Sequence, residues 1–209
     1  MSTSSPSISD MHAAPVPCLV EGTLDEAVVR KMLDISSLIA GSFYLESLPA
    51  FRTRLKAYNR AAQHSTWFGL CDLDDDDCAP ARVQSYLPDR AVGMCFRVAV
   101  TAVEAWLLAD RANMARFLCV SGDMIDPQPE QLAAPKSHLV SLARRSRSRA
   151  IREGLVPAAG DSRRVGPEYT LPMSEFVRER WCPQRAAERS PSLRGAMDRC
   201  RSLAVTGRW

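Results

Sequence analysis

The sequence predicts an α/β fold with a mainly parallel sheet flanked by helices and a helical C-terminal extension. Short apolar runs alternate with amphipathic stretches along the first half of the chain. The runs are continuously apolar, which is typical of parallel strands buried on both faces. The 209 residues are 46% hydrophobic and 24% charged, close to globular averages, so one compact unit is expected rather than two large domains.

The first 15 residues are predicted to be a disordered N-terminus. They lack the positive and apolar regions of a secretory signal, and no apolar run approaches the ~18 residues that cross a bilayer. Seven scattered cysteines without a C-x-x-C pair argue against a disulfide framework and against a structural zinc site. A cytoplasmic protein without a membrane partner is therefore expected.

A strand, an acidic turn and a helix open the folded chain. The strand covers residues 16–20 and ends at Glu21-Gly22. Thr23 and Glu26 form a predicted capping box, which starts a helix that continues to about residue 38. Residues 41–49 are expected to be a loop, and residues 51–62 form a basic amphipathic helix.

Two further strands follow, each leading into polar or helical sequence. Residues 67–71 form a short apolar strand that ends in a run of aspartates from position 72. A short helix or turn covers 79–87, and residues 94–100 are a strand that leads into the segment 103–110. Trp106 in this segment is expected in the core, because a helix behind a sheet needs bulk.

The C-terminal half is predicted to be mostly helical. A helix covers 139–155 and an exposed loop covers 156–172, which holds two glycines and three prolines. Ser190-Pro191 starts the last helix, whose apolar stripe is Leu193, Met197, Cys200 and Ala204. We therefore expect an α/β domain over 16–155, with residues 156–209 packed on the same domain as a loop plus helical extension.

The two halves of the chain carry opposite charge. Residues 1–110 hold 9 basic and 14 acidic side chains, giving −5, whereas residues 111–209 hold 18 and 10, giving +8. Only three of the 27 basic residues are lysines, and arginine suits phosphate recognition, although genome composition could also cause this bias. The predicted nucleic-acid-binding residues, for which a solvated basic face is the alternative, are Arg144, Arg145, Arg147, Arg149 and Arg152.

Acidic side chains follow the predicted strands, where ligands bind in open α/β sheets. Glu21 and Asp72 stand at strand ends, Asp25 is in the following helix, Asp74 is two residues after Asp72, and Glu104 follows the third strand. Two charges ~4 Å apart repel by ~1 kcal/mol in water and by ~4 kcal/mol at an effective dielectric constant of 20. Such a cluster needs cations, and Mg²⁺ or Mn²⁺ prefers oxygen ligands.

Other interpretations of the aspartate run remain. Asp75, Asp76 and Asp77 are expected in a solvated turn or helix cap. A calcium EF-hand is excluded, because its sixth and twelfth positions would be Asp77 and Val83. A D-x-D phosphatase or glycosyltransferase remains a minor alternative, whereas the motifs of P-loop NTPases, dinucleotide enzymes and zinc hydrolases are absent.

The order of these motifs resembles the Toprim domain. Glu21-Gly22 followed by Asp25, and a second strand followed by Asp72-x-Asp74, look like the E-G-x-x-D form found in OLD-type nucleases of bacterial defence systems. Residues 97–100 and 103–110 are similar to a bacterial Toprim-related family known only as a domain of unknown function. The resemblance spans about residues 16–152 and implies a Toprim-like fold.

The resemblance also implies roles for individual residues. The five acidic residues would surround metal, with Glu21 as a ligand or general base, and Lys136 is similar to a lysine that those nucleases place near the scissile phosphate. Two departures affect Glu104: Thr101 stands near the position of a serine, and the spacing to the glutamate is one residue longer.

The expected function is therefore Mg²⁺-dependent cleavage of DNA or RNA, as an effector of anti-phage defence. The main alternative is a non-catalytic Toprim-like subunit that docks to an ATPase partner, which an exposed stripe on the last helix would favour. A homodimer is also open. A D-x-D small-molecule phosphotransfer enzyme is the third hypothesis, which a narrow closed pocket would favour.

Overall fold

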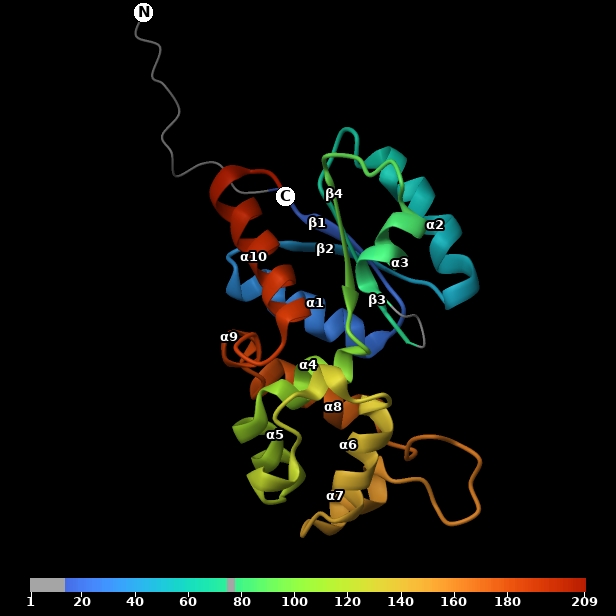
Figure 1. The fold of residues 1–209 in the computed structure, drawn as a ribbon, viewed down its shortest axis with the longest axis vertical. Coiled ribbons are helices and arrows are strands. Elements are labelled where there is room, and N and C mark those ends of the chain that lie inside the picture. Colours follow the sequence, from blue (N-terminus) through green and yellow to red (C-terminus); the bar gives the residue numbers. More distant parts are fainter. Residues whose placement is uncertain (1–13, 75–77) are drawn as a thin grey trace, which may run out of the picture.

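The computed structural model describes residues 14–74 and 78–209 (Figure 1). The chain has an α/β fold with a four-stranded, all-parallel sheet in the order β2-β1-β3-β4, which confirms the predicted class. Most of the predicted disordered segment 1–15 and the aspartates at positions 75–77 lie outside the described residues. The strands are β1 (Val16–Val20), β2 (Ala40–Leu45), β3 (Trp67–Asp72) and β4 (Met94–Ala99).

Strand β2 corrects the prediction of a loop over 41–49. It pairs with β1 in parallel, with Leu19 opposite Tyr44, and the ladder continues where the Glu46 amide donates to the Val20 carbonyl at 3.0 Å. The strand lies at the sheet edge and is only partly buried. Its signal in the sequence is weak because Gly41 and Ser42 interrupt the apolar pattern.

Helices cover both faces of the sheet. Helices α1 (Thr23–Ile35) and α10 (Pro191–Thr206) lie on one face, and α2 (Leu48–Ala61) and α3 (Ala79–Tyr86) lie on the other (Figure 1). Alternate strand residues serve the two layers: Cys18 and Val20 face the first, whereas Leu19 faces the second. This burial on both faces explains the continuously apolar strands.

A group of short helices lies beyond the carboxyl ends of the strands (Figure 1). They are α4 (Val103–Ala109), α5 (Arg111–Leu118), α6 (Pro135–Arg144), α7 (Arg149–Leu155), α8 (Thr170–Glu179) and α9 (Pro183–Ala186), with 3₁₀ turns at Gly122–Met124 and Pro129–Gln131. This group and the sheet edge together surround four of the predicted acidic site residues, Glu21, Asp25, Asp72 and Glu104.

Several helix boundaries differ from the predictions. The single helix over 139–155 is wrong, because α6 ends at Arg144 and Ser148 caps a separate α7, its Oγ accepting from the Ile151 amide. The capping box of Thr23 is also wrong: Gly22 is the N-cap of α1. That helix ends at residue 35 rather than 38. The predicted cap of α10 is confirmed, since Ser190 Oγ accepts from the Leu193 amide.

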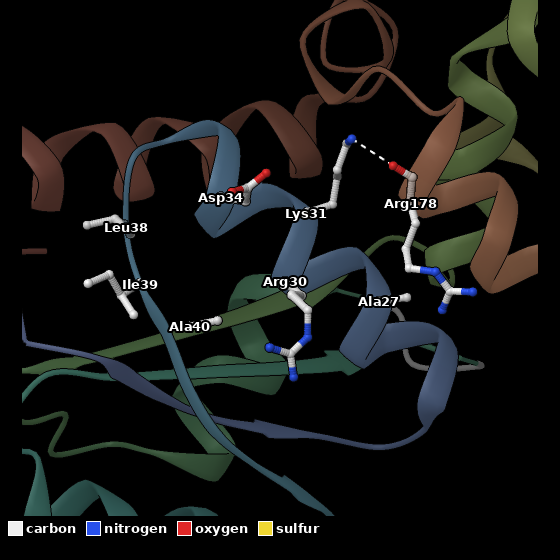
Figure 2. Close-up of a pocket in the computed structure, with 8 residues that line it drawn as sticks. All are labelled: Ala27, Arg30, Lys31, Asp34, Leu38, Ile39, Ala40 and Arg178. Atoms are coloured by element: carbon white, nitrogen blue, oxygen red, sulfur yellow. Dashed lines mark hydrogen bonds between the residues drawn. The ribbon is translucent and has the colours of Figure 1, made fainter.

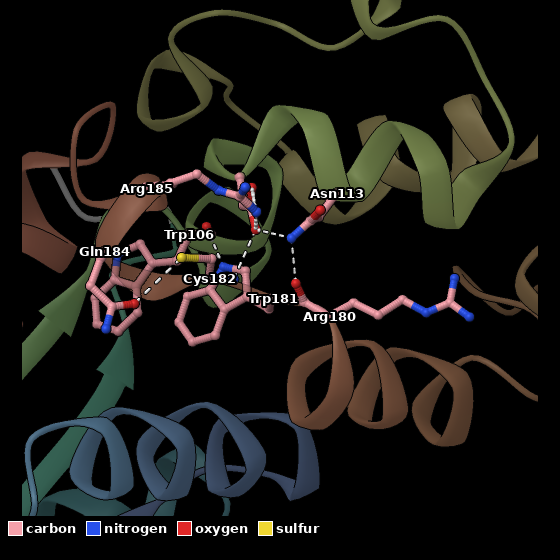
Figure 3. A network of polar contacts seen from close by, with 8 residues as sticks. Trp106, Asn113, Arg180, Trp181, Cys182, Gln184 and Arg185 are labelled. Atoms are coloured by element: carbon pink, nitrogen blue, oxygen red, sulfur yellow. Dashed lines mark hydrogen bonds and ion pairs between the residues drawn. The ribbon is translucent and has the colours of Figure 1, made fainter.

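The C-terminal extension is bound to the α/β part by a buried polar network (Figure 3). The Asp110 carboxylate, 2% exposed, accepts from the Cys182 amide at 2.8 Å and from Asn113 at 3.0 Å, and it pairs with Arg185 at 3.2 Å. The buried Trp181 indole donates to the Trp106 carbonyl at 3.3 Å. Trp106 is fully buried, as predicted.

The apolar stripe of the last helix faces the core. Leu193, Met197 and Cys200 are buried, and only Ala204 is exposed. The stripe therefore offers no surface for a partner. Among the residues that the structure describes, no helix is long and apolar enough to cross a membrane.

Candidate functional site

The strand order places a crevice between the carboxyl ends of β1 and β3. Helix α1 leaves β1 on one face of the sheet, whereas α2 returns the chain to β3 across the other face. The loops after β1 and β3 therefore diverge, which makes this point the usual ligand-binding position of an open α/β sheet. Glu21 follows β1, and Asp72 is the last residue of β3.

Backbone amides hold three carboxylates at this edge. Glu21 Oε1 accepts from the Asp72 amide at 3.3 Å, which connects the two strand ends directly. Asp25 Oδ2 accepts from the Gly22 amide at 2.8 Å, so this residue completes the N-terminal cap of α1. Asp72 Oδ1 accepts from the Val103 amide at 2.9 Å and satisfies the first turn of α4, whose own N-cap is an alanine.

Glu104 is the most deeply buried carboxylate of the group. It lies in the first turn of α4, is 1% exposed, and its Oε1 accepts from the Tyr169 hydroxyl at 3.1 Å. Lys136 Nζ, at the start of α6, lies 3.4 Å from the same oxygen. Glu104 Oε2 is buried and has no hydrogen-bond partner within the described residues. A buried, unpaired carboxylate oxygen is costly unless a ligand or water satisfies it.

These side chains line one pocket of about 340 Å³. Four of the five predicted metal ligands, Glu21, Asp25, Asp72 and Glu104, are brought together there with Lys136. The segment before α8 supplies Val165 and Tyr169 as another wall. The sequence expectation that acidic residues from three separate regions meet in one place holds for these four, and we call them the carboxylate cluster.

Asp74 does not line this pocket but an adjoining one of about 540 Å³, although its charge still acts on Glu21. The chain leaves the sheet at Asp72, and Asp74 takes a left-handed conformation, φ 50°, so it does not extend the strand pattern. The two pockets share Asp72 and Lys136 as a common wall. The second pocket also contains Arg82 and Arg164.

Burial and mutual repulsion raise the pKa values of the carboxyl groups in the carboxylate cluster. Burial, followed by the charge of Asp74, raises the pKa of Glu21 to about 7. Burial, followed by the charges of Glu104 and Glu21, raises the pKa of Asp25 to about 7. Burial and the charges of Asp25 and Glu104 raise the pKa of Asp72 well above its usual range. A cation would stabilise the ionised forms of all three.

Lys136 and Tyr169 respond to the same negative field. Burial alone would lower the pKa of Lys136, but the nearby charges of Glu104 and Asp72 raise it above the ordinary value. Burial and the charge of Glu104 raise the pKa of Tyr169 well above its usual range. Lys136 is therefore a cation and Tyr169 a neutral hydrogen-bond donor at neutral pH.

The predicted nucleic-acid-binding arginines do not line either pocket. Arg144 lies at the C-terminal end of α6, about 12 Å from Lys136 along the helix axis at 1.5 Å per residue. All five are exposed. Arg149 pairs with Glu153 at 2.7 Å, and Arg152 donates to the Ser146 carbonyl. The five arginines are divided between two separate helices, α6 and α7, and the turn that joins them.

Three site residues were missed by the sequence analysis. Tyr169 and Arg164 belong to the predicted exposed loop 156–172, which is instead anchored by the Gly166 and Glu168 amides on carbonyls of α7. Arg82 is buried and donates to the carbonyls of Asp72 and Leu73.

A separate pocket of about 460 Å³ contains none of the predicted site residues (Figure 2). It lies among α1, the start of β2 and α8. Two of its three cations have partners: Lys31 donates to the Arg178 carbonyl at 2.9 Å, and Arg30 pairs with Glu26 at 2.8 Å. We therefore restrict the functional argument to the carboxylate cluster.

The chemistry of the carboxylate cluster fits a hard divalent cation, although its present side-chain positions do not form a complete ligand set. Oxygen donors, shared negative charge and the unpaired Glu104 Oε2 are what Mg²⁺ or Mn²⁺ requires. Within residues 14–74 and 78–209, no group of three or more His, Cys, Asp or Glu side chains is arranged to hold a metal ion. Several carboxylate oxygens are instead turned to the donors named above.

Comparison of the chain with models of known families, with curated proteins and with solved structures found no match.

Proposed function

We propose that the protein hydrolyses phosphodiester bonds of DNA or RNA with Mg²⁺ or Mn²⁺ held at the carboxylate cluster. The observation that carries this proposal is the buried Glu104 Oε2, which has no partner within the described chain and lines a pocket with three other carboxylates. The Toprim-like order of the acidic motifs supports the same chemistry, and the expected setting is the cytoplasm of a cell that defends itself against phage.

Glu21, Asp25, Asp72 and Glu104 would hold the cation. A divalent cation supplies activation of a water molecule and stabilises charge on the phosphate and leaving oxygens of an in-line displacement. The second oxygen of each carboxylate would supply the ligand, so the hydrogen bonds that Asp25 Oδ2, Asp72 Oδ1 and Glu104 Oε1 now accept can remain.

The protein's own residues supply proton transfer and charge. Glu21 is partly exposed, and a bound cation would favour its ionised form, which can take a proton from water. Lys136 stands at the mouth shared by the two pockets, where its ammonium group can neutralise charge on a phosphate. Tyr169 fixes the orientation of Glu104 through its hydroxyl.

The direct experiment is a cleavage assay with plasmid, single-stranded DNA and tRNA, in Mg²⁺ or Mn²⁺. Asp72→Asn keeps the shape of the side chain and removes one charge, and we expect it to reduce cleavage by about 100-fold or more. Asp89→Asn is the matched control, since Asp89 is exposed and lines neither pocket. Equal cleavage by the wild type and Asp72→Asn, with both folded by circular dichroism, would contradict the proposal.

The hypothesis of a non-catalytic interaction subunit lacks the observation that was expected to favour it. An exposed stripe on α10 was its expected sign, and Leu193, Met197 and Cys200 are buried. The phosphotransfer hypothesis is tested by p-nitrophenyl phosphate in the same assay: turnover of this small ester without cleavage of any nucleic acid would favour it.

A further inference from the structure

The pocket beside the carboxylate cluster has the opposite chemical character. Arg82, Lys136 and Arg164 line it, together with Ser137, and Asp72 and Asp74 are its acidic residues. Its volume of about 540 Å³ is within the usual range of small-ligand sites. These side chains carry three formal positive charges against two negative ones, and one of the three, Lys136, is also paired with Glu104 of the carboxylate cluster.

Backbone donors add to this positive character. Helix α6 has ten residues and begins at Pro135 against this pocket. Its N-cap is Ala134, and among residues 14–74 and 78–209 no side chain is found to accept from its first turn. The amides of Lys136 and Ser137 therefore lack intrahelical acceptors, and the N-terminal end of the helix carries partial positive charge. Anions bind at such positions when side-chain cations stand beside them.

The three cations differ in how far they are engaged. Arg82 is buried and donates to the Asp72 and Leu73 carbonyls, so it contributes charge and holds the strand end. Lys136 pairs with Glu104 at 3.4 Å. Arg164 is exposed, and no ion pair or hydrogen bond of its side chain is found in the described part of the chain.

The position of Arg164 is fixed by its neighbours. The Gly166 amide donates to the Leu155 carbonyl at 2.9 Å, and the Glu168 amide donates to the Gly154 carbonyl at 3.0 Å. A side chain at position 166 would meet the Gly154 carbonyl oxygen at 2.3 Å, so this close approach requires glycine. The segment that carries Arg164 is thus held against α7 on one side and against Glu104 through Tyr169 on the other.

We infer that this second pocket binds a phosphate group of the substrate, next to the phosphodiester that is hydrolysed at the carboxylate cluster. The Arg164 guanidinium offers a fork of donors for phosphate oxygens, and the first turn of α6 offers amide donors. Lys136 stands between the two phosphates, because it lines both pockets. The link to hydrolysis rests on the proposed function, whereas phosphate binding itself does not.

The test is a binding measurement on the full-length protein in buffer with EDTA, so that no metal contributes. Inorganic phosphate is titrated by calorimetry, and a fluorescent tetrathymidylate is titrated by anisotropy. We expect Arg164→Gln to weaken both by about fivefold or more, as one charge-assisted contact at an exposed site predicts. Arg163→Gln is the matched control, because Arg163 is the adjacent arginine, pairs with Asp161 and lines neither pocket.

Four outcomes would overturn the inference: no saturable phosphate binding, equal weakening by Arg163→Gln and Arg164→Gln, no weakening by Arg164→Gln, or weakening of the oligonucleotide alone. Arg164→Lys keeps the positive charge but removes the forked donors of the guanidinium, so it should retain only part of the affinity. Arg164-dependent phosphate binding without any cleavage in Mn²⁺ would refute the proposed hydrolysis and keep this inference. Cleavage that Asp72→Asn abolishes, together with phosphate binding that Arg164→Gln leaves unchanged, would refute this inference and keep the proposed hydrolysis.

Discussion

The Tyr169 hydroxyl donates a 3.1 Å hydrogen bond to Glu104 Oε1, across 65 residues of sequence. Tyr169 belongs to the segment before α8, and Glu104 lies in the first turn of α4. A residue of the C-terminal extension thus orients Glu104, the most buried acid of the carboxylate cluster. The C-terminal extension is therefore part of the site and not only a support for the sheet.

Replacing Tyr169 by Phe tests this contact. The change leaves the ring in place and removes the donor, so Glu104 Oε1 keeps only Lys136. We expect the free energy of unfolding to fall by about 1–2 kcal/mol, the usual cost of losing one partner of a buried hydrogen bond. Urea unfolding measures the difference. Tyr58→Phe is the control and should cost little, because the Tyr58 hydroxyl has no hydrogen bond among the described residues; equal losses would contradict the assignment.

The carboxylate cluster predicts that the metal-free protein loses stability as the pH rises. Burial and neighbouring charges raise the pKa of Glu21 and of Asp25 to about 7, so the folded chain keeps protons that the unfolded chain releases at pH about 4. This stabilisation is complete below pH about 4 and is lost as the pH rises through 7. After allowance for coupling and solvent screening, a loss of about 2 kcal/mol lowers the melting temperature by about 4–8 °C.

Differential scanning fluorimetry at pH 5.5 and pH 8, in EDTA, measures this difference. Added Mn²⁺ should raise the melting temperature more at pH 8 than at pH 5.5, because protons compete with the metal for the carboxylates. Asp25→Asn should flatten the pH dependence, whereas Glu168→Gln, an exposed neutralisation beside Tyr169, should leave it unchanged. A melting temperature that does not fall between pH 5.5 and pH 8 in EDTA would count against the cluster.

Asp110 should matter for stability rather than for chemistry. Its carboxylate satisfies the Cys182 amide, Asn113 and Arg185 at the join between α4 and the extension. Asp110→Ala leaves these donors without a buried acceptor, so we expect a loss of about 3 kcal/mol. Asp123→Ala, which breaks an ion pair at a 96% exposed carboxylate, should cost at most about 0.5 kcal/mol. Chemical denaturation of both variants measures the two losses, and equal losses would contradict a structural role of Asp110.

The arginines near α7 remain a predicted surface for nucleic acid outside the two pockets. Arg144 and Arg145 are exposed and make no side-chain ion pair within the described chain, so they are the best candidates for phosphate contacts. Replacing both by Gln should reduce the slope of log affinity against log salt by about 2 for duplex DNA. Arg149→Gln should change it less, because Arg149 already pairs with Glu153. An unchanged slope in the double variant would assign these arginines to a solvated face.

The sequence predicted the parts of the fold that rest on local patterns. Buried strands such as β1 and β3 show as apolar runs, and the acids after them follow from strand-end chemistry. The edge strand β2 was missed because its pairing with β1, and not its own composition, stabilises it. The split between α6 and α7 was missed because Ser148 can lie inside a helix or cap one, and only packing decides.

The composition of the carboxylate cluster was predictable, whereas its positive surroundings were not. Glu21, Asp25, Asp72 and Glu104 were found from their spacing relative to strands. Asp74 was predicted as a fifth ligand, and a left-handed turn places it in the neighbouring pocket, where its charge still acts on Glu21; no pattern in D-x-D signals that turn. Tyr169 and Arg164 reach the site through a loop whose anchors are backbone contacts, which leave no trace in side-chain patterns.

The most direct measurement is a calorimetric titration of Mn²⁺ into the wild-type protein and into Glu104→Gln at pH 8. The glutamine can still accept from Tyr169, so the fold should persist, whereas the buried negative charge is gone. We expect saturable binding by the wild type, about tenfold or more weaker binding by Glu104→Gln, and no change for Glu168→Gln. No binding by the wild type, or equal affinity in wild type and Glu104→Gln, would contradict a cation site at the carboxylate cluster.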